Sequence, residues 1–368
     1  MTTPTKVTFG KSIGFRKELN RRVEAYMEAE NIAPRDNLAM YLKTVVIFSW
    51  LISAWTFTVF GPPVLWMKLL GCVALGLAVA GVGFSVGHDA NHGGYSNSKL
   101  VNRLIGLSYD FIGLSSYLWQ FRHNTLHHIY PNMLGYDIEI HADALVRLSP
   151  DIQYKWHHKY QHILIWFLYP FIPFYWSAAD VYLILVKLKY QEHEIPKPST
   201  VELITLLAFK LVWLGWLVAI PIAVGYSPLE AILGFALTYM TYGAVIFVIF
   251  MLAHVMDGLE FIKPNEEFNS LEDEWAVWQL KTTADFAPKN LFLNWYLGGL
   301  NYQAVHHLFP HICHIHYPKI AKIVAEVCEE FGVNYQVYDT FWDALSSHYR
   351  WLKKLGVAPA PNYSHQLN

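Results

Sequence analysis

The chain has 368 residues, of which 54% are hydrophobic and only 15% are charged. This is more apolar and less charged than an ordinary soluble domain, and the formal net charge of −2 gives no electrostatic reason to expect nucleic-acid binding. The three cysteines form no CxxC pair and are odd in number, which argues against a disulfide framework and favours a reducing compartment.

Four apolar runs are long enough to cross a bilayer core, which needs about 20 residues. They cover residues 42–60, 66–87, 202–224 and 231–253. Gly- and Pro-containing turns separate the members of each pair, so each pair is predicted to form a helical hairpin. Both short hairpin connections lack Lys and Arg, whereas basic residues gather before, between and after the hairpins. The positive-inside rule therefore predicts that both termini and the middle segment are cytosolic.

A fifth apolar run, residues 163–186, competes with this topology. It contains Pro170, Pro173 and Asp180 and is crowded with Trp and Tyr. A fifth crossing would also put the last histidine cluster, described below, on the opposite side of the membrane from the first two. We therefore interpret this run, and the shorter run 104–119, as lying in the membrane interface. The alternative is that residues 163–186 cross the membrane and the clusters are unrelated.

The predicted fold is a single all-α membrane domain with four transmembrane helices, interfacial helices and a cytosolic helical cap. Its parts are a cytosolic amphipathic segment (1–41), a first hairpin (42–87), a cytosolic and interfacial segment (88–201), a second hairpin (202–253) and a cytosolic C-terminal segment (254–368). An apolar stripe through Phe15, Leu19 and Val23 predicts an N-terminal helix that packs on a core or on the membrane surface. Near the other end, Pro318 can begin a helix that Gly332 ends.

Seven histidines form three clusters, each close to a membrane-length run. Two imidazoles four residues apart on a helix share a face and can converge on one ion, while an adjacent histidine is rotated by about 100° and can serve a second ion. His254 ends the fourth run at the same predicted height as His88. The candidate ligands of a two-metal centre are therefore His88, His92, His123, His127, His128, His254, His306 and His307.

Several polar residues near these clusters have two interpretations. Gln303 is expected to hold a ligand or a water, because a neutral amide binds metal weakly. The carboxylates Asp89, Asp137 and Glu139 could orient ligand imidazoles, but we expect solvated loop carboxylates. Lys210, inside the third run, is expected to snorkel to the cytosolic surface. A further group could bind metal but is expected to serve loop packing: His311, Cys313, His314 and His316.

The sequence resembles the membrane fatty acid desaturases along nearly its whole length. The three histidine boxes and their order match that family, and a Gln that opens the third box, here Gln303, marks the front-end type. The stretches 86–92, 109–116, 251–254 and 301–310 look most like the cyanobacterial acyl-lipid delta-6 desaturases. The resemblance implies that the box histidines and His254 hold two irons.

The resemblance also implies partners. Many front-end relatives carry a fused cytochrome b5 domain with a His-Pro-Gly-Gly motif, and the residues before the first run are too few for one. Electrons are then expected from a separate donor, which the resemblance implies is ferredoxin. The expected function is O2-dependent insertion of a cis double bond, at delta-6, into lipid-linked acyl chains such as linoleoyl in a cyanobacterial plasma or thylakoid membrane.

Four alternatives stay open at this point. The same centre could desaturate at delta-5 or in a sphingolipid, or it could hydroxylate a fatty acid. A membrane metal transporter with histidines at its entrance is the alternative outside enzymology. A transporter is expected to carry polar or charged side chains through several spans, whereas only Lys210 lies well inside one of the four runs.

Overall fold

A computed structural model describes residues 7–140, 145–264 and 269–358 of the chain. The described part is mostly helical, as predicted, with two small two-stranded sheets in addition. The first hairpin and the turn after it consist of α2 (Leu38–Phe60), α3 (Leu65–Gly81), the π-helical η1 (Val82–Gly87) and α4 (His88–Asn91). The second consists of α10 (Thr200–Leu214), η7 (Gly215–Ala219), α11 (Ile220–Ala223) and α12 (Pro228–His254).

The segment between the hairpins is built from short helices. They are α5 (Lys99–Gly106), α6 (Ser108–Phe111), α7 (Ser116–Trp119), η2 (Gln120–His127), η3 (Ile138–Ile140), η4 (Trp156–Tyr160), α8 (Gln161–Leu168), η5 (Tyr169–Phe171), α9 (Ile172–Tyr182) and η6 (Leu183–Lys187). The antiparallel pair β1 (Lys189–Tyr190) and β2 (His193–Glu194) completes it.

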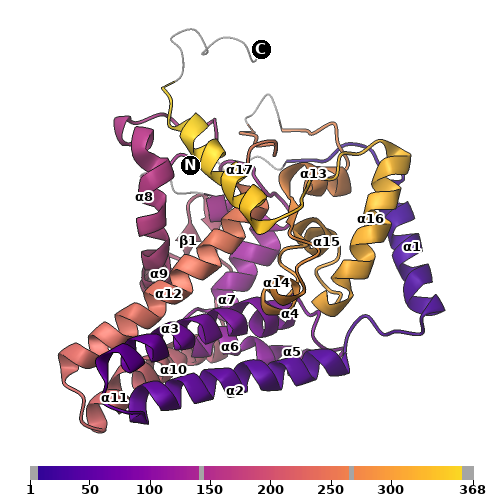
Figure 1. Cartoon of the computed structure of the whole chain (residues 1–368). Helices are drawn as coiled ribbons and strands as arrows, with labels where there is room; N and C mark the ends of the chain where they lie inside the picture. The colour runs from indigo at the N-terminus through magenta and orange to yellow at the C-terminus, as the bar shows by residue number, and fades with distance from the viewer. Residues whose placement is uncertain (1–6, 141–144, 265–268, 359–368) are drawn as a thin grey trace.

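The C-terminal segment adds a second layer beside the hairpins, with α1 (Phe15–Ala29) against it. Its elements are α13 (Trp275–Thr282), β3 (Asp285–Phe286), α14 (Leu291–Tyr296), α15 (Gln303–Leu308), η8 (His314–His316), α16 (Tyr317–Phe331), β4 (Val337–Tyr338) and α17 (Phe341–Leu355). Strands β3 and β4 pair in parallel. In Figure 1, α13, α15 and α16 lie apart from the lobe formed by α2, α3, α10 and α12.

Local sequence signals define the ends of the long helices. The Asn37 side chain accepts a hydrogen bond from the backbone of Ala39 at the start of α2, and Ser227 and Glu230 form a capping box at the start of α12. Gly76 lets α3 approach α12 closely, because a Cβ there would lie 2.5 Å from the Thr238 carbonyl oxygen. Small residues have this role where helices pack in membranes.

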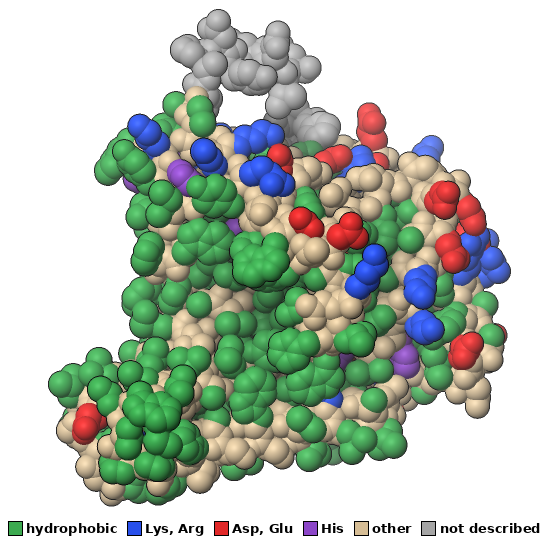
Figure 2. Space-filling view, in the orientation of Figure 1, with side chains coloured by type: hydrophobic (Ala, Val, Ile, Leu, Met, Phe, Trp, Pro, Cys, Tyr) green, Lys and Arg blue, Asp and Glu red, His purple; other side chains and the backbone are tan. Residues whose placement is uncertain are grey.

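Five helical stretches are long and apolar enough to cross a membrane: Leu38–Phe60, Leu65–Asn91, Trp156–Lys187, Thr200–Ala223 and Pro228–His254. Four of them match the predicted runs, and the fifth contains the competing run 163–186. Run 104–119 is instead broken into α5, α6 and α7. Figure 2 shows hydrophobic side chains covering the lower left of the molecule, while Lys, Arg, Asp and Glu gather at the top and right.

Both helices predicted near the chain ends are present. Helix α1 buries Phe15, Leu19 and Val23, and these side chains share one apolar cluster with Ile320 and Val324 of α16. The N-terminal stripe therefore packs on protein. Pro318 lies in the first turn of α16, and Gly332 follows its last residue with a left-handed φ of 65°, as the sequence predicted.

Candidate metal centre

The eight candidate histidines come from four separate parts of the chain and meet in one place. Helix α4 and the residue after it carry His88 and His92, and η2 and the residue after it carry His123, His127 and His128. His254 is the last residue of α12, and α15 carries His306 and His307. All are buried except His92, which is partly exposed.

The imidazoles form two groups whose nitrogen atoms lie within 4.8 Å of one another: His88, His92, His123 and His306 in the first, and His127, His254 and His307 in the second. His128 lies between them. Its Nε2 is 3.2 Å from Nε2 of His123 in the first group, and its ring stacks on His307 of the second with centroids 4.1 Å apart. The geometry therefore fits two ions, with His128 within reach of both groups.

The split between neighbouring histidines differs in part from the prediction. The adjacent pair His306 and His307 divides between the groups, as expected. His123 and His127, expected to share one ion, fall into different groups. The physical reason is that η2 is a π-helix, in which the aligned position is five residues on rather than four. The backbone N–H of His128 accordingly donates to the carbonyl of His123.

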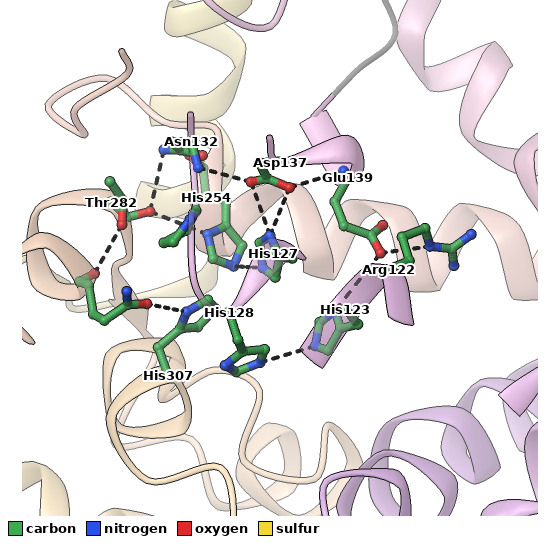
Figure 3. A network of polar contacts seen from close by, with 12 residues as sticks. Arg122, His123, His127, His128, Asn132, Asp137, Glu139, His254, Thr282 and His307 are labelled. Carbon is green, nitrogen blue, oxygen red and sulfur yellow. Dashed lines mark hydrogen bonds and ion pairs between the residues drawn. The ribbon is translucent and has the colours of Figure 1, made fainter. Parts of the chain in front are cut away.

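The loop carboxylates are not solvated, which corrects the interpretation made from sequence. Asp137 is fully buried, and both of its carboxylate oxygens lie 3.0 Å from Nδ1 of His127 (Figure 3). Glu139 forms a buried ion pair with Arg122 at 2.9 Å and lies 3.9 Å from Nδ1 of His123. A carboxylate behind a ligand imidazole fixes its tautomer and raises its basicity, so Asp137 is placed to orient His127.

Other partners of the histidines were not predicted. The Gln279 amide oxygen lies 2.8 Å from Nδ1 of His307, and the Thr282 carbonyl oxygen lies 3.3 Å from Nδ1 of His254. The Tyr317 hydroxyl lies 3.3 Å from Nδ1 of His306. No motif marks these three residues, because each reaches the site through tertiary packing. Gln303, which was singled out, has its amide nitrogen 2.8 Å from Nε2 of His254.

The chemistry of the donor set fits metal ions. Within the described part of the chain, Nε2 of His92, His306 and His307 is buried without a hydrogen-bond partner. Burial, and then the neighbouring imidazoles, lower the pKa of each of these side chains well below its usual value. The rings are therefore neutral at pH 7 and present free lone pairs, which is the state that binds a metal.

The region around His314 supports the loop-packing interpretation. The Asp89 carboxylate lies 2.8 Å from Nδ1 of His314, and the Lys43 ammonium lies 2.8 Å from its Nε2. The Cys313 thiol lies close enough for Asp89, Cys313 and His314 to form a third group of potential metal donors. Because both ring nitrogens of His314 already have polar partners, these contacts favour a structural role. They also correct the expectation that Asp89 is solvated.

Lys210 does not extend into solvent as expected for a snorkelling side chain. Its ammonium donates a hydrogen bond of 2.6 Å to the Gly113 carbonyl and lies 3.6 Å from the Asp180 carboxylate. Only 12% of the Lys210 side chain and 5% of the Asp180 side chain are exposed. The charge in the third run is thus paired within the protein, and it links α10 to α9.

A narrow cavity of about 60 Å³ opens beside the first histidine group. His88, His123, Glu139 and Gln303 supply its polar wall. Its remaining walls are mainly apolar and aromatic: Gly83, Phe84, Tyr109, Trp119, Trp176, Ile246, Phe247, Ile249, Phe250 and Leu300. A larger cavity of about 430 Å³ lies beside α13 and the end of α16, and it is lined by none of the eight histidines. The apolar cavity is therefore the one that can bring a hydrocarbon chain to the metal-binding groups.

The class of protein follows from this combination of apolar helices, clustered imidazoles and a hydrocarbon-lined cavity, and comparisons with known proteins agree with it. The sequence model of the fatty acid desaturase family matches residues 63–339. The chain belongs to this family.

Individual relatives narrow the comparison. The chain is 63% identical over 366 residues to an sn-1 linoleoyl-lipid 6-desaturase of Arthrospira platensis, with 100% of this chain and 99% of the relative covered. It is 51% identical to an sn-1 linoleoyl-lipid 6-desaturase of Synechocystis sp., with 97% of this chain and 100% of the relative covered. An acyl-lipid (8-3)-desaturase of Physcomitrium patens is 32% identical, with 92% of this chain and 71% of the relative covered.

Proposed function

We propose that this protein is an acyl-lipid delta-6 desaturase that acts on linoleoyl chains of membrane lipids. The observation that carries the proposal is the convergence of eight histidines beside an apolar cavity, and the full-length similarity to two linoleoyl-lipid 6-desaturases supports it. The overall reaction breaks one C–H bond on each of two adjacent methylenes. With O2, two electrons and two protons, it yields a cis double bond and two waters.

The proposed cofactor is a pair of iron ions. The first would be held by His88, His92, His123 and His306, and the second by His127, His254 and His307, with His128 between them. Imidazole suits several metals, and iron is the one that matches oxygen chemistry at a site with open positions. When bound, the irons supply the oxidising power for C–H cleavage. Asp137 would hold the His127 ring in place, and Gln303 would hold His254 beside the open position.

The cavity provides positioning. Phe84, Trp119 and Phe250 would fix a hydrocarbon chain against the first histidine group and exclude water from it. Holding two particular methylenes next to the metals converts a random encounter into an intramolecular step, so the distance from the lipid headgroup to the histidines selects the bond. This role accounts for a site whose polar wall includes two imidazoles and whose other walls are mainly apolar.

The proposed topology has four crossings with the histidines and both termini in the cytosol. The meeting of His88 with His254 and His306 supports it, because an odd number of crossings between them would separate them. This argument makes Trp156–Lys187 an interfacial helix, although it is long enough to cross. Its course in Figure 1 supports the same reading, since α8 runs crosswise to α2. The proposed boundaries between the cytosolic segments and the two hairpins, after residues 41, 87, 201 and 253, follow from this topology.

Electrons are proposed to come from ferredoxin, with O2 as the oxidant, in a cyanobacterial plasma or thylakoid membrane. The cytosolic location of the histidine site in the proposed topology puts it on the side where a soluble donor is available. A donor that is reduced and re-oxidised one electron at a time must dock twice per turnover, because each double bond requires two electrons.

Expression in a host supplied with linoleate, iron and ferredoxin tests the proposal. The fatty acids of the host should contain a new cis bond at delta-6, with the pre-existing bonds retained. Absence of any new product under these conditions would overturn the assignment. A delta-5 bond, a sphingolipid product or a hydroxylated chain would instead identify one of the related activities, and metal uptake by proteoliposomes without product would identify a transporter.

A further inference from the structure

Helix α14 exposes an apolar face in the segment assigned to the cytosol. Leu291 is 82% exposed, Phe292 66% and Trp295 36%. These side chains lie on a helix of only six residues, so the apolar face is concentrated rather than scattered. A clustered apolar surface of this kind indicates a membrane or protein contact.

The contacts of α14 are with the membrane helices. The Tyr296 hydroxyl donates a hydrogen bond of 2.7 Å to the carbonyl of Leu77 in α3, and the Tyr296 carbonyl accepts one of 3.1 Å from the Ser85 hydroxyl. The Tyr296 and Trp50 rings have centroids 5.9 Å apart. In Figure 1, α14 lies between α15 and α4.

The turn after α14 also approaches the membrane helices closely. Gly298 has a φ of 60°, and a Cβ at this position would lie 2.4 Å from the Phe84 carbonyl oxygen. Only glycine suits both the backbone conformation and this distance. The close approach therefore fixes the segment beside η1.

These contacts place α14 well inside the length of the hairpin. Leu77 precedes His88 by 11 residues, which corresponds to about 16 Å of helical rise. Trp50 follows the first residue of α2 by 12 residues, or about 18 Å. Half of a bilayer core is about 15 Å thick. If α2 and α3 cross the membrane, the Tyr296 hydroxyl reaches about the middle of the core, while the Tyr296 carbonyl, bonded to Ser85 only three residues before His88, lies in the cytosolic leaflet.

The apolar face of α14 belongs to an element packed against α2, whose outward side chains are also apolar. Leu42, Val45 and Val46 are 58%, 63% and 51% exposed. Trp295 joins the two elements, because the Lys43 ammonium lies 5.5 Å from the centre of its ring. Helix α2 is one of the stretches long and apolar enough to cross a membrane, so its exposed side chains are expected to face lipid, and α14 packs beside it.

The start of α14 has a side-chain cap, and its last turn is closed by a backbone hydrogen bond from Leu297 to the Leu293 carbonyl, as an element inside lipid requires. The Asn290 side chain accepts a hydrogen bond of 3.0 Å from the Leu293 backbone. The Pro288 carbonyl accepts hydrogen bonds from the Asn294 amide at 2.9 Å and from the Tyr302 hydroxyl at 2.7 Å. These contacts satisfy polar backbone groups at the point where the chain enters the helix.

We propose that α14 is a re-entrant element whose Leu291, Phe292 and Trp295 side chains contact the acyl chains of the cytosolic leaflet. The inference rests on the topology given under the proposed function. It assigns part of the C-terminal segment to the membrane rather than to the cytosolic cap. It also connects lipid directly to the site, because the turn after α14 leads to Leu300 and Gln303, which line the apolar cavity.

Spin labels on single cysteines test this in protein reconstituted into liposomes. Phe292→Cys is the main variant, and Leu291→Cys is a second one whose more exposed side chain contributes less to packing. Ile52→Cys on the exposed side of α2 is the lipid reference, and Trp342→Cys on α17 is the cytosolic reference; their native side chains are 61% and 69% exposed. The three native cysteines are free and buried, and labelling the unmodified protein measures their background.

Collision rates with oxygen, which enriches in lipid, and with a water-soluble nickel complex give the result. We expect positions 291 and 292 to match position 52, with oxygen collisions several-fold above nickel collisions. A match to position 342 overturns the inference. So does exclusion of both reagents, which would mean that a protein surface covers α14. Product formation by the same variants, and the readings at positions 52 and 342, separate this failure from failure of the proposed function or topology.

Discussion

The two histidine groups are held in different ways. In the group of His127, His254 and His307, each Nδ1 faces a polar partner: the Asp137 carboxylate, the Thr282 carbonyl and the Gln279 amide oxygen. In the other group the neighbours are largely aromatic, since the Trp119 ring lies 4.3 Å from the His123 ring and 5.5 Å from the His88 ring.

The two groups differ in their partners because only one of them borders the apolar cavity. His88 and His123 line the apolar cavity, whereas none of His127, His254 and His307 does. The carboxylate that lines the cavity, Glu139, is paired with Arg122 at 2.9 Å, and at 3.9 Å it lies too far from Nδ1 of His123 for a direct hydrogen bond. Direct hydrogen-bond support is therefore concentrated behind the group that is remote from the cavity, whereas most of the cavity wall is apolar. Four predictions examine this division.

Removing a ligand from either group should have the largest effect. His127→Ala and His306→Ala should each abolish desaturation, because each removes a ligand from one of the two proposed irons, and the proposed centre would need both to supply two oxidising equivalents together. Fatty-acid profiles of the expressing host measure the product, and membrane fractionation checks that each variant is still inserted. If one variant kept substantial activity, the two groups could not form one centre.

Replacing the orienting carboxylate should have the next largest effect. Asp137→Asn preserves shape but removes the negative charge at Nδ1 of His127, and loss of such a partner typically costs about 10- to 100-fold in metal affinity or activity. Iron content and turnover of the purified protein measure it. Asp339→Asn, at an exposed loop carboxylate, is the matched control. If the two variants had equal iron content and turnover, Asp137 would have no role in orienting His127.

Acid should destabilise the iron-free protein. Burial lowers the pKa of His128, His306 and His307 in the folded state, whereas the unfolded chain titrates near 6.5. The unfolded state therefore binds more protons as pH falls below about 6.5, and stability present above that pH is lost by up to about 1.4 kcal/mol per pH unit for each such histidine. Melting temperatures at pH 7.5 and 5.5 measure this. An unchanged value would contradict the buried neutral state.

Changing a partner in the cavity-facing group should have the smallest effect. Tyr317→Phe removes a hydroxyl 3.3 Å from Nδ1 of His306 while keeping the ring. A typical hydrogen bond contributes about 1 kcal/mol, which corresponds to roughly a fivefold loss of turnover. Turnover with iron content held equal is the appropriate measurement. A loss as large as that of Asp137→Asn would erase the distinction between the two groups.

The sequence indicated the site because its chemistry is local. The spacing of His88 and His92, and the position of His254 at the end of an apolar run, are visible without a fold. The pairing within 123–128 was wrong because a π-helical turn depends on tertiary packing and leaves no clear mark in composition. Asp137 was interpreted as solvated because a carboxylate in an irregular segment gives no sign of which distant elements will cover it.

The apolar character of the helical runs made the helices predictable but left their surroundings undetermined. A long apolar run predicts a helix that is removed from water. It does not tell whether lipid, the protein core or the membrane interface surrounds that helix, because all three accept the same side chains. Thus residues 163–186 and the α1 stripe were recognised as apolar helices, while only the structure showed that Phe15 and Leu19 pack on α16. Helix α14 was not predicted at all, since six residues carry too little periodicity to stand out.

The distribution of the ligands along the chain has a consequence for biosynthesis. Each histidine group takes one member from α15, which is translated only after the last membrane-length helix. A nascent chain that has completed α12 can be fully inserted and still lack a complete binding set for either ion. Capture of the proposed irons is therefore expected to follow membrane insertion, and a truncation just after residue 254 should give a stably inserted but inert product.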